Sequence, residues 1–252
     1  MFRPRIIPIL LLKGKGLVKT TKYSDPRYIG DPINAVRIFN DLEADELVFL
    51  DISASHENRT ISVDLVKEIG DEAYMPFSVG GGINTVQQAV DLINSGAEKV
   101  IFNTLFAENP KMISQISKIL GNQSIVVSID VKKTFWGKLN MHYKSGKKST
   151  SLDPIVAAKK AEELGAGEII LNYIPFDSMM KGYNLDLIEE VSKNVSIPVV
   201  ASCGAGSLLH MKEANDAGAH ALAAGSMFVY HGPRRAVLVN YPTKEELIAT
   251  FQ

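Results

Sequence analysis

The amino-acid sequence predicts an α/β fold, a (β/α)8 TIM barrel built from two fused half-barrels. The chain has 252 residues, which is about the length of one such barrel. Eight short apolar runs alternate with longer amphipathic segments, as in parallel strands joined by helices. Segments of the first half also recur in the second half at a constant offset of 122 residues. Because no linker or low-complexity tract interrupts the pattern, residues 1–252 are expected to form a single barrel domain.

The eight apolar runs are the predicted strands. They do not alternate with polar residues, and this is typical of strands that are buried on both faces. In chain order they are Ile6–Leu12, Leu47–Ile52, Pro76–Val79, Val100–Asn103, Ile125–Asp130, Ile169–Asn172, Pro198–Ala201 and Ala221–Ala224.

The amphipathic segments between the runs are the predicted helices. The first has the clearest start, because Asp31 is an N-cap residue followed by Pro32 at the first helical position. The expected helices are Asp31–Leu42, Val63–Ala73, Thr85–Ser95, Pro110–Leu120, Pro154–Leu164, Leu185–Asn194, Leu208–Ala217 and Lys244–Phe251.

Two further segments that follow predicted strands have no helical pattern of their own. Lys13–Gly30 comes after the first strand and is long for such a connection, so we expect a mobile lid. Thr134–Lys148 comes after the fifth strand, is polar and contains Trp136, and we expect a hairpin-like excursion there.

The internal repeat predicts a duplicated half-barrel. Residues 64–66 match residues 186–188, residues 95–97 match 217–219, and Thr104 matches Ser226. A constant offset over some 45 residues favours duplication, although any α/β barrel can show weak self-similarity.

Composition excludes several classes of protein. Hydrophobic residues make up 46% of the chain, so a large core is available, and a net charge of −1 excludes a generally basic nucleic-acid-binding protein. Cys203 is the only cysteine, and the five histidines lack metal-ligand spacing, so we expect no disulfide, no metal and no cofactor. Apolar stretches such as Ile6–Leu12 are too short to span a membrane, and no signal peptide is recognisable. A cytoplasmic protein is expected.

Glycine-containing loops follow three of the predicted strands, and Asn103 and Thr104 follow a fourth, all at the end of the barrel where active sites lie. Such loops let backbone N–H groups approach a phosphate. Their pairing in both halves favours a small molecule with phosphate at both ends, whereas the alternative is that the glycines only form tight turns. The expected substrate- and phosphate-binding residues are Lys19, Asp51, Gly81, Gly82, Asn103, Thr104, Gly204, Gly206, Gly225 and Ser226.

Two carboxylates end predicted strands. Asp130 ends the fifth strand and is the candidate catalytic acid or base, because a carboxylate at this end of a barrel is placed for proton transfer. Asp51 ends the second strand, where it can serve the same chemistry or only accept hydrogen bonds that fix its loop.

Four charged residues precede predicted strands at the opposite end of the barrel. Two are basic and two are acidic, so their side chains can converge as a charged layer, either as structural ion pairs or as a polar aperture. These residues are Arg5, Glu46, Lys99 and Glu168.

The sequence resembles the cyclase subunit of imidazole glycerol phosphate synthase over essentially its whole length. The segments that carry the resemblance are Glu46–Ser55, Val79–Ile83, Val127–Asp130, Ser145–Lys148 and Gly165–Glu168. The resemblance implies that a glutaminase subunit docks on the N-terminal face of the barrel and that ammonia passes through the barrel to a bisphosphate substrate. It also implies that Arg5, Glu46, Lys99 and Glu168 gate the entrance for ammonia.

The chain departs from that family at three places. The family has an aspartate at the end of strand 1, where this chain has Leu11, so one of the two acid–base groups is missing. The loop after strand 6 resembles Asp-Arg-Asp-Gly-Thr in the family, whereas residues 175–179 read Pro-Phe-Asp-Ser-Met here. Cys203 stands where a glycine is usual.

Other segments are similar to the glycosyl amidation-associated proteins of surface-polysaccharide pathways, namely Ile7–Lys13, Gly16–Thr20 and Gly232–Pro242. That resemblance implies an ammonia-conducting subunit that pairs with a glutaminase and supplies a sugar amidotransferase, which converts an acetamido group into an acetamidino group. A cyclase of histidine biosynthesis and a non-catalytic docking scaffold for the glutaminase are the alternatives.

Overall fold

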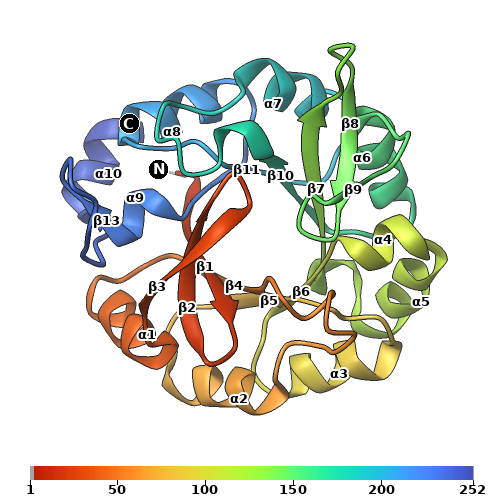
Figure 1. Cartoon of the computed structure of the whole chain (residues 1–252), viewed down its shortest axis with the longest axis horizontal. Coiled ribbons are helices and arrows are strands. Elements are labelled where there is room, and N and C mark those ends of the chain that lie inside the picture. The colour runs from red at the N-terminus through yellow and green to blue at the C-terminus, as the bar shows by residue number, and fades with distance from the viewer. Residues whose placement is uncertain (1–2, 252) are drawn as a thin grey trace.

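The computed structural model describes residues 3–251 and contains a closed barrel of eight parallel strands (Figure 1). Each strand pairs with the next, and β12 pairs with β1 to close the ring. All eight predicted strands are present, and their ends differ from the predicted ends by at most three residues. The barrel strands are β1 (Arg5–Lys13), β4 (Leu47–Asp51), β5 (Phe77–Gly80), β6 (Lys99–Phe102), β7 (Ile125–Lys133), β10 (Glu168–Tyr173), β11 (Val199–Ser202) and β12 (Ala221–Ala224).

The helices surround the barrel as an outer layer (Figure 1). Their starts follow the predicted capping: Asp31 accepts a hydrogen bond from Asn34 N, and Thr85 forms a capping box with Gln88. The long helices are α1 (Pro32–Asp41), α2 (Val63–Glu72), α3 (Val86–Asn94), α5 (Lys111–Leu120), α6 (Pro154–Glu163), α7 (Leu185–Ser192), α8 (Leu208–Asp216) and α10 (Lys244–Phe251). The short ones are α4 (Thr104–Glu108), α9 (Ser226–Val229) and the 3₁₀ turns η1 (Asn122–Ser124) and η2 (Ile174–Phe176). Within residues 3–251, no helix has the length and apolar character needed to cross a membrane.

The barrel strands are buried on both faces, which explains their continuous apolar runs. On β1, Ile6 and Leu10 point outward into the core shared with the helices, while Ile7 and Ile9 point inward. The inward side chains fill the barrel with a second, smaller apolar cluster. Its buried members are Ile7, Ile9, Val48, Ile101, Val126, Ile170, Val200, Ala221 and Ala223.

The two halves of the barrel repeat at the offset that the sequence predicts. The bounds of β5, α3 and β6 recur 122 residues later in β11, α8 and β12. The turns after α3 and α8 also match, because Gly96 and Gly218 have φ values of 107° and 103°. Both turns need a left-handed conformation that glycine adopts without strain. The prediction of two fused half-barrels is therefore confirmed.

The segment Lys13–Gly30, expected to be a mobile lid, contains no helix and forms regular strands, which the sequence did not indicate; its mobility stays a prediction. The segment forms an antiparallel hairpin of β2 (Gly16–Thr21) and β3 (Ser24–Gly30), and β2 pairs with β1 from Leu11 to Lys13. Burial of Leu17 and Val18 against the barrel holds the hairpin in place, a contact that the short apolar run does not reveal by itself.

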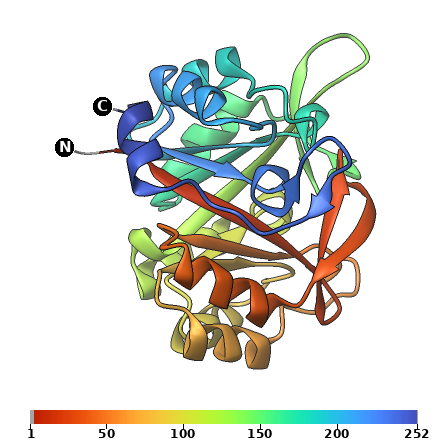
Figure 2. The same ribbon diagram turned by 90° about the vertical axis from the view of Figure 1, so that its left-hand side faces the viewer.

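The predicted excursion after the fifth strand is confirmed. β7 continues beyond the barrel and pairs with β8 (Leu139–Tyr143), which in turn pairs with β9 (Lys148–Ser149). A small hairpin of β13 (Tyr230–His231) and β14 (Ala236–Val237) follows the last barrel strand. Figure 2 shows that the hairpins project from the face of the barrel opposite the two chain termini.

Candidate functional site

A cavity of about 420 Å³ opens at the carboxyl ends of the barrel strands. Loops from both halves of the barrel line it, as does the β2–β3 hairpin. With one exception, the predicted substrate and catalytic residues line this cavity. They are Lys19, Asp51, Gly81, Gly82, Asn103, Thr104, Asp130, Gly204, Gly225 and Ser226. The exception is Gly206, whose N–H donates to His210 Nδ1 at 3.2 Å.

Asp130 is the buried carboxylate of the cavity. Its Oδ1 accepts hydrogen bonds from Asn172 Nδ2 at 2.9 Å, Ser128 Oγ at 3.2 Å and the Tyr23 hydroxyl at 3.3 Å. Burial raises the pKa of Asp130 to about 6, although these hydrogen bonds favour the charged form. A carboxyl group that titrates near neutral pH can both donate and accept a proton.

Leu11 faces the same cavity from β1. β1 and β7 are four strands apart in the closed order, so Leu11 and Asp130 lie on opposite sides of the barrel. An isobutyl side chain has no proton to transfer and accepts no hydrogen bond. The cavity therefore has one acid–base group at the position of Asp130 and an apolar wall where a second group would complete a pair.

Asp51 is bound within its own loop. Its Oδ1 accepts from Ser53 N, Ser53 Oγ and Ala54 N at 2.9–3.1 Å, and its Oδ2 lies 2.6 Å from Arg59 Nη1. These partners occupy both carboxylate oxygens, so the geometry favours the loop-fixing interpretation of this residue.

The glycine loop of the first half lies close to the loop after β4. Gly82 has a φ of 65°, and a Cβ atom there would lie 1.8 Å from Arg59 O. The glycine is therefore needed for packing whether or not the loop binds an anion. Asn103 is held next to it, because its Nδ2 donates to Ser128 O at 3.1 Å and His142 O at 3.2 Å.

In the corresponding region of the second half, which also lines the cavity, polar side chains of the protein pair with one another. Lys19 Nζ lies 3.2 Å from Asp177 Oδ1, and both side chains are buried. Ser178 Oγ lies 2.8 Å from Ser226 Oγ and donates to Thr20 O. The charge of Lys19 is thus matched by a carboxylate, and the hydroxyl of Ser226 already has a partner.

Two residues in this region have a backbone conformation that favours glycine. Cys203 has a φ of 69° and Ser178 a φ of 61°. Both stand where the resembled family has glycine, so the chain keeps the backbone of those loops and adds side chains to it.

The polar partners of Asp130 and Lys19 were not identified as site residues from the sequence, namely Tyr23, Ser128, Asn172 and Asp177. The sequence could have indicated Ser128, because it lies two residues before Asp130 and so points to the same face of β7. It contains no indication of Tyr23, because this residue reaches Asp130 only through the fold of the β2–β3 hairpin.

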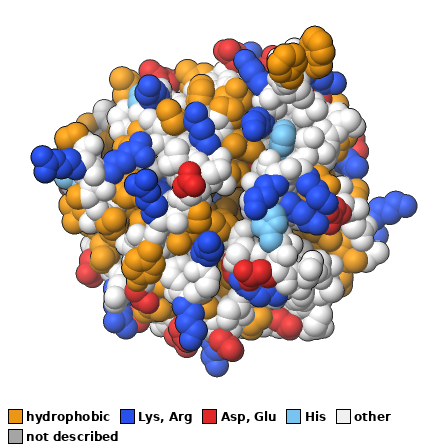
Figure 3. All heavy atoms as spheres, viewed as in Figure 1, with side chains coloured by type: hydrophobic (Ala, Val, Ile, Leu, Met, Phe, Trp, Pro, Cys, Tyr) orange, Lys and Arg blue, Asp and Glu red, His pale blue; other side chains and the backbone are white. Residues whose placement is uncertain are grey.

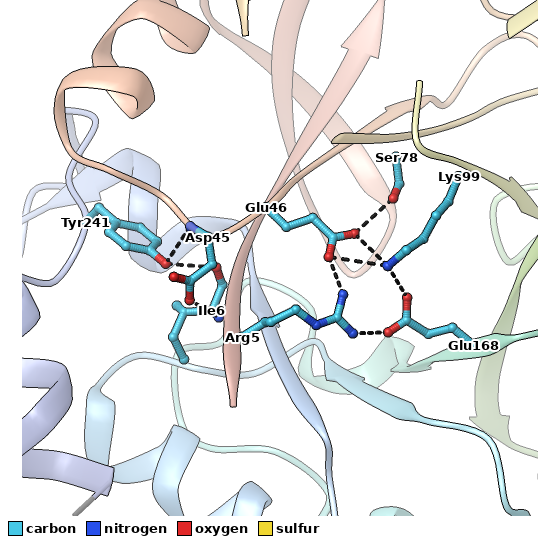
Figure 4. Close-up of polar contacts among 8 residues, drawn as sticks. All are labelled: Arg5, Ile6, Asp45, Glu46, Ser78, Lys99, Glu168 and Tyr241. Atoms are coloured by element: carbon cyan, nitrogen blue, oxygen red, sulfur yellow. Dashed lines mark hydrogen bonds and ion pairs between the residues drawn. The ribbon is translucent and has the colours of Figure 1, made fainter. Parts of the chain in front are cut away.

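The four charged residues at the other end of the barrel form a closed ring (Figure 4). Arg5 contacts both Glu46 and Glu168, and Lys99 Nζ lies 3.2 Å from Glu46 Oε1 and 2.7 Å from Glu168 Oε2. Ser78 Oγ also donates to Glu46 Oε1 at 2.9 Å. Each carboxylate therefore lies between two cations.

The two glutamates of the ring stabilise the charged form of Arg5. Burial lowers the pKa of Arg5, but Glu168 and Glu46 raise it further, so the net shift is upward. Both glutamates are buried, while Arg5 and Lys99 are partly exposed. Buried charges are stable only when they are paired in this way. The inward apolar cluster lies between the ring and the cavity. Two of its members, Ile9 and Ile101, also line the cavity.

Among residues 3–251, no group of three or more histidine, cysteine, aspartate or glutamate side chains is placed to hold a metal ion.

The structure defines the class of protein: a (β/α)8 barrel with a polar cavity at the carboxyl ends of its strands and a charged ring at the amino ends. The model of the histidine biosynthesis protein family matches residues 5–233, and the chain belongs to this family. The resemblance to the synthase subunits of imidazole glycerol phosphate synthase is confirmed by curated relatives.

One relative, from Leptospira interrogans, is 47% identical over the whole of both chains, and another, from Pseudomonas aeruginosa, is 44% identical over 98% of this chain and 99% of its own. Both are named provisionally as subunits of imidazole glycerol phosphate synthase. A third, from Alkaliphilus metalliredigens, is 40% identical over 92% of each chain and is named imidazole glycerol phosphate synthase subunit HisF.

Proposed function

We propose that this protein is the ammonia-conducting synthase-type subunit of a glutamine amidotransferase complex. In this proposal a glutaminase docks on the N-terminal face of the barrel as the second subunit of a heterodimer. The ammonia serves a sugar amidotransferase that replaces the amide oxygen of an acetamido group with nitrogen. The sugar belongs to a surface polysaccharide.

The observation that carries the proposal is Leu11 opposite Asp130 in a barrel whose charged ring is complete. The charged ring, to which the proposal assigns the passage of ammonia, is complete, while one of the two groups that the proposal requires for proton transfer in a cyclisation is replaced by Leu11. A protein that only had to fold could fill the ring positions with leucine or valine.

The ring and the barrel interior suit the passage of ammonia. Lys99 is the member proposed to move, because a single ammonium group on a flexible alkyl chain makes both of its contacts, whereas Arg5 uses two nitrogens of a planar guanidinium group. When its ammonium group turns aside, Arg5 still pairs with both glutamates, so the carboxylates stay neutralised. The apolar side chains beyond the ring favour neutral ammonia over the ammonium ion.

The cavity is assigned to a phosphorylated small molecule. The first-half loop at Gly81, Gly82, Asn103 and Thr104 is the part of the cavity that the protein's own side chains leave open to an anion. Arg59 also lines this part of the cavity, where its guanidinium group is paired with Asp51 and Glu57.

The second candidate is the cyclase subunit of histidine biosynthesis. Two observations favour it: relatives named imidazole glycerol phosphate synthase subunit HisF are 39–41% identical, and Asp130 has a pKa near neutral. A non-catalytic docking scaffold is the third candidate, and it requires that the cavity bind no ligand.

The test uses one genetic and one biochemical measurement. The gene should fail to rescue a histidine auxotroph that lacks its own cyclase subunit. The purified barrel, mixed with its glutaminase and the sugar amidotransferase, should support amidination from glutamine. Rescue of the auxotroph at the level of a true cyclase, together with no amidination, would establish the second candidate instead.

A further inference from the structure

The β7–β8 hairpin carries an exposed pair of aromatic side chains at its tip. Phe135 is 94% exposed and Trp136 is 89% exposed, and their rings stack edge to face at 5.4 Å. Because neither ring packs on the barrel core, the fold of this chain does not account for them. Large exposed aromatic side chains are typical of docking sites.

The base of this hairpin is firmly held, so its tip is a fixed projection. Val131 and Met141 face each other across β7 and β8 and are fully buried. At the tip, Thr134 N donates to Lys138 O at 2.7 Å and Gly137 N donates to Thr134 O at 3.0 Å. We name residues 132–138 the aromatic arm.

The surroundings of the aromatic arm are basic. Residues 131–149 contain six lysines and no aspartate or glutamate, although the whole chain has a net charge of −1. Lys132, Lys133 and Lys138 flank the aromatic pair and are exposed. Figure 3 shows lysine and arginine side chains gathered around the mouth of the barrel on this face, with apolar side chains projecting where the tip lies. The face therefore complements an acidic surface that offers an apolar recess.

The base of the aromatic arm lies beside the cavity, and its tip projects outward past the ring of helices (Figure 1). Asp130 lies on β7, the strand that becomes the arm, and Ser145, which follows β8, lines the cavity wall. Phe135 is five residue steps along the chain from Asp130, a reach of about 16 Å when extended. A protein bound along the whole arm, from its tip to its base, would therefore extend to the edge of the cavity.

We infer that the aromatic arm is the docking contact for the enzyme that consumes the ammonia, a protein with an acidic surface around an apolar recess. The inference rests on the proposed function, because a conduit that receives ammonia at the ring must be covered at its other mouth if ammonia is not to reach solvent. Phe135 and Trp136 enter the recess, and the flanking lysines orient the approach. A lipid surface explains the aromatic and basic residues equally well, but it does not explain why they are carried by β7, the strand that also supplies Asp130 to the cavity.

Trp136 permits a direct test, because it is the only tryptophan of the chain. Barrel protein that carries 5-fluorotryptophan has a single fluorine resonance at the tip. Addition of the sugar amidotransferase should change the chemical shift of this resonance, whereas the glutaminase, which docks at the other end, should leave the chemical shift unchanged. An unmoved resonance at saturating amidotransferase would overturn the inference. A shift with phosphatidylglycerol vesicles in place of the amidotransferase would also overturn it and assign the arm to lipid.

The matched variants are Phe135→Ser with Trp136→Ser, and Ile38→Ser as the control. Ile38 is an exposed apolar residue on the outer helix α1. The double variant should bind the amidotransferase at least about tenfold more weakly and release ammonia to solvent while glutamine hydrolysis is unchanged. The control should behave as the unmodified protein. Equal affinity of the double variant would sink the inference.

The two proposals fail in distinguishable ways. If the three proteins together form no amidine from glutamine, the proposed function is wrong. If amidine is formed and the double variant forms it with the same coupling to glutamine hydrolysis, only the role of the aromatic arm is wrong.

Discussion

Leu11 and Asp130 face each other across the cavity, one an isobutyl group and the other a buried carboxyl group with a pKa of about 6. In a cyclase the two positions form an acid–base pair, and here only one member of the pair can exchange a proton. The consequence for chemistry can be measured directly.

The protein should lack useful ammonia-dependent cyclase activity. Loss of one general acid or base costs roughly 10²–10⁴-fold in rate. The measurement supplies the purified barrel with an ammonium salt and the ribulosyl bisphosphate substrate of the family. Leu11→Asp is the companion variant, and we expect it to restore only weak activity because the paired side chains of Ser178 and Asp177 still line the second half of the cavity. Turnover by the unmodified protein at the rate of a biosynthetic enzyme would contradict this prediction.

Phosphate should occupy the first-half loop and not the second. Near Gly82 and Asn103 the cavity is open, whereas Ser226 is hydrogen-bonded to Ser178. Crystals grown in phosphate should show one ion, and Ser178→Gly should allow a second by removing the side chain from a position with a φ of 61°. If crystals of the unmodified protein show neither site occupied, the docking scaffold becomes the better candidate.

Stability should depend on pH through Asp130. Burial raises its pKa from the ordinary value near 4 to about 6. Between about pH 4 and pH 6 the folded protein keeps a proton that the unfolded chain has lost. The free energy of unfolding therefore falls as the pH rises through this window and levels off above it.

Asp130→Asn removes this titration. Relative to the unmodified protein, the variant should gain stability between pH 4 and pH 7 by up to about 3 kcal/mol, since two pKa units correspond to about that energy. Denaturant unfolding of both proteins across this range gives the difference. A difference that stays constant with pH would show that the carboxyl group titrates at its ordinary value.

The sequence predicted the barrel closely because its local signals agree with the fold. The apolar runs, the N-cap at Asp31 and the repeat at 122 residues each specify a strand, a helix start or a turn without reference to distant contacts. The β2–β3 hairpin was missed because its burial depends on contacts with the barrel, and its strands show little alternation of their own.

The candidate site was predictable in its types of residue but not in its pairings. Asp130 and the glycine loops follow strands, so topology alone brings them to one end of the barrel. The contacts of Lys19 with Asp177 and of Ser178 with Ser226 join residues 158 and 48 positions apart. No local pattern specifies such pairs, and they decide which half of the cavity remains open.

The charged ring should couple glutamine hydrolysis to amidination. Lys99→Ala leaves Arg5 as the only cation paired with Glu46 and Glu168. The variant should still fold, and its loss of stability should not exceed about 3–5 kcal/mol, the cost of breaking a buried ion pair. Lys193→Ala is the control, because Lys193 pairs with Glu189 on the exposed surface of α7, where such a pair contributes little. Calorimetry should show that the glutaminase binds both variants, and its activity, which is low until it docks, should rise in both complexes. The yield of amidine per glutamine hydrolysed should change only for Lys99→Ala, because only that variant alters the aperture between the two active centres. If the glutaminase does not bind the unmodified barrel, and Lys99→Ala leaves amidination in cells unchanged, the ring is a structural plug that closes the foot of the barrel.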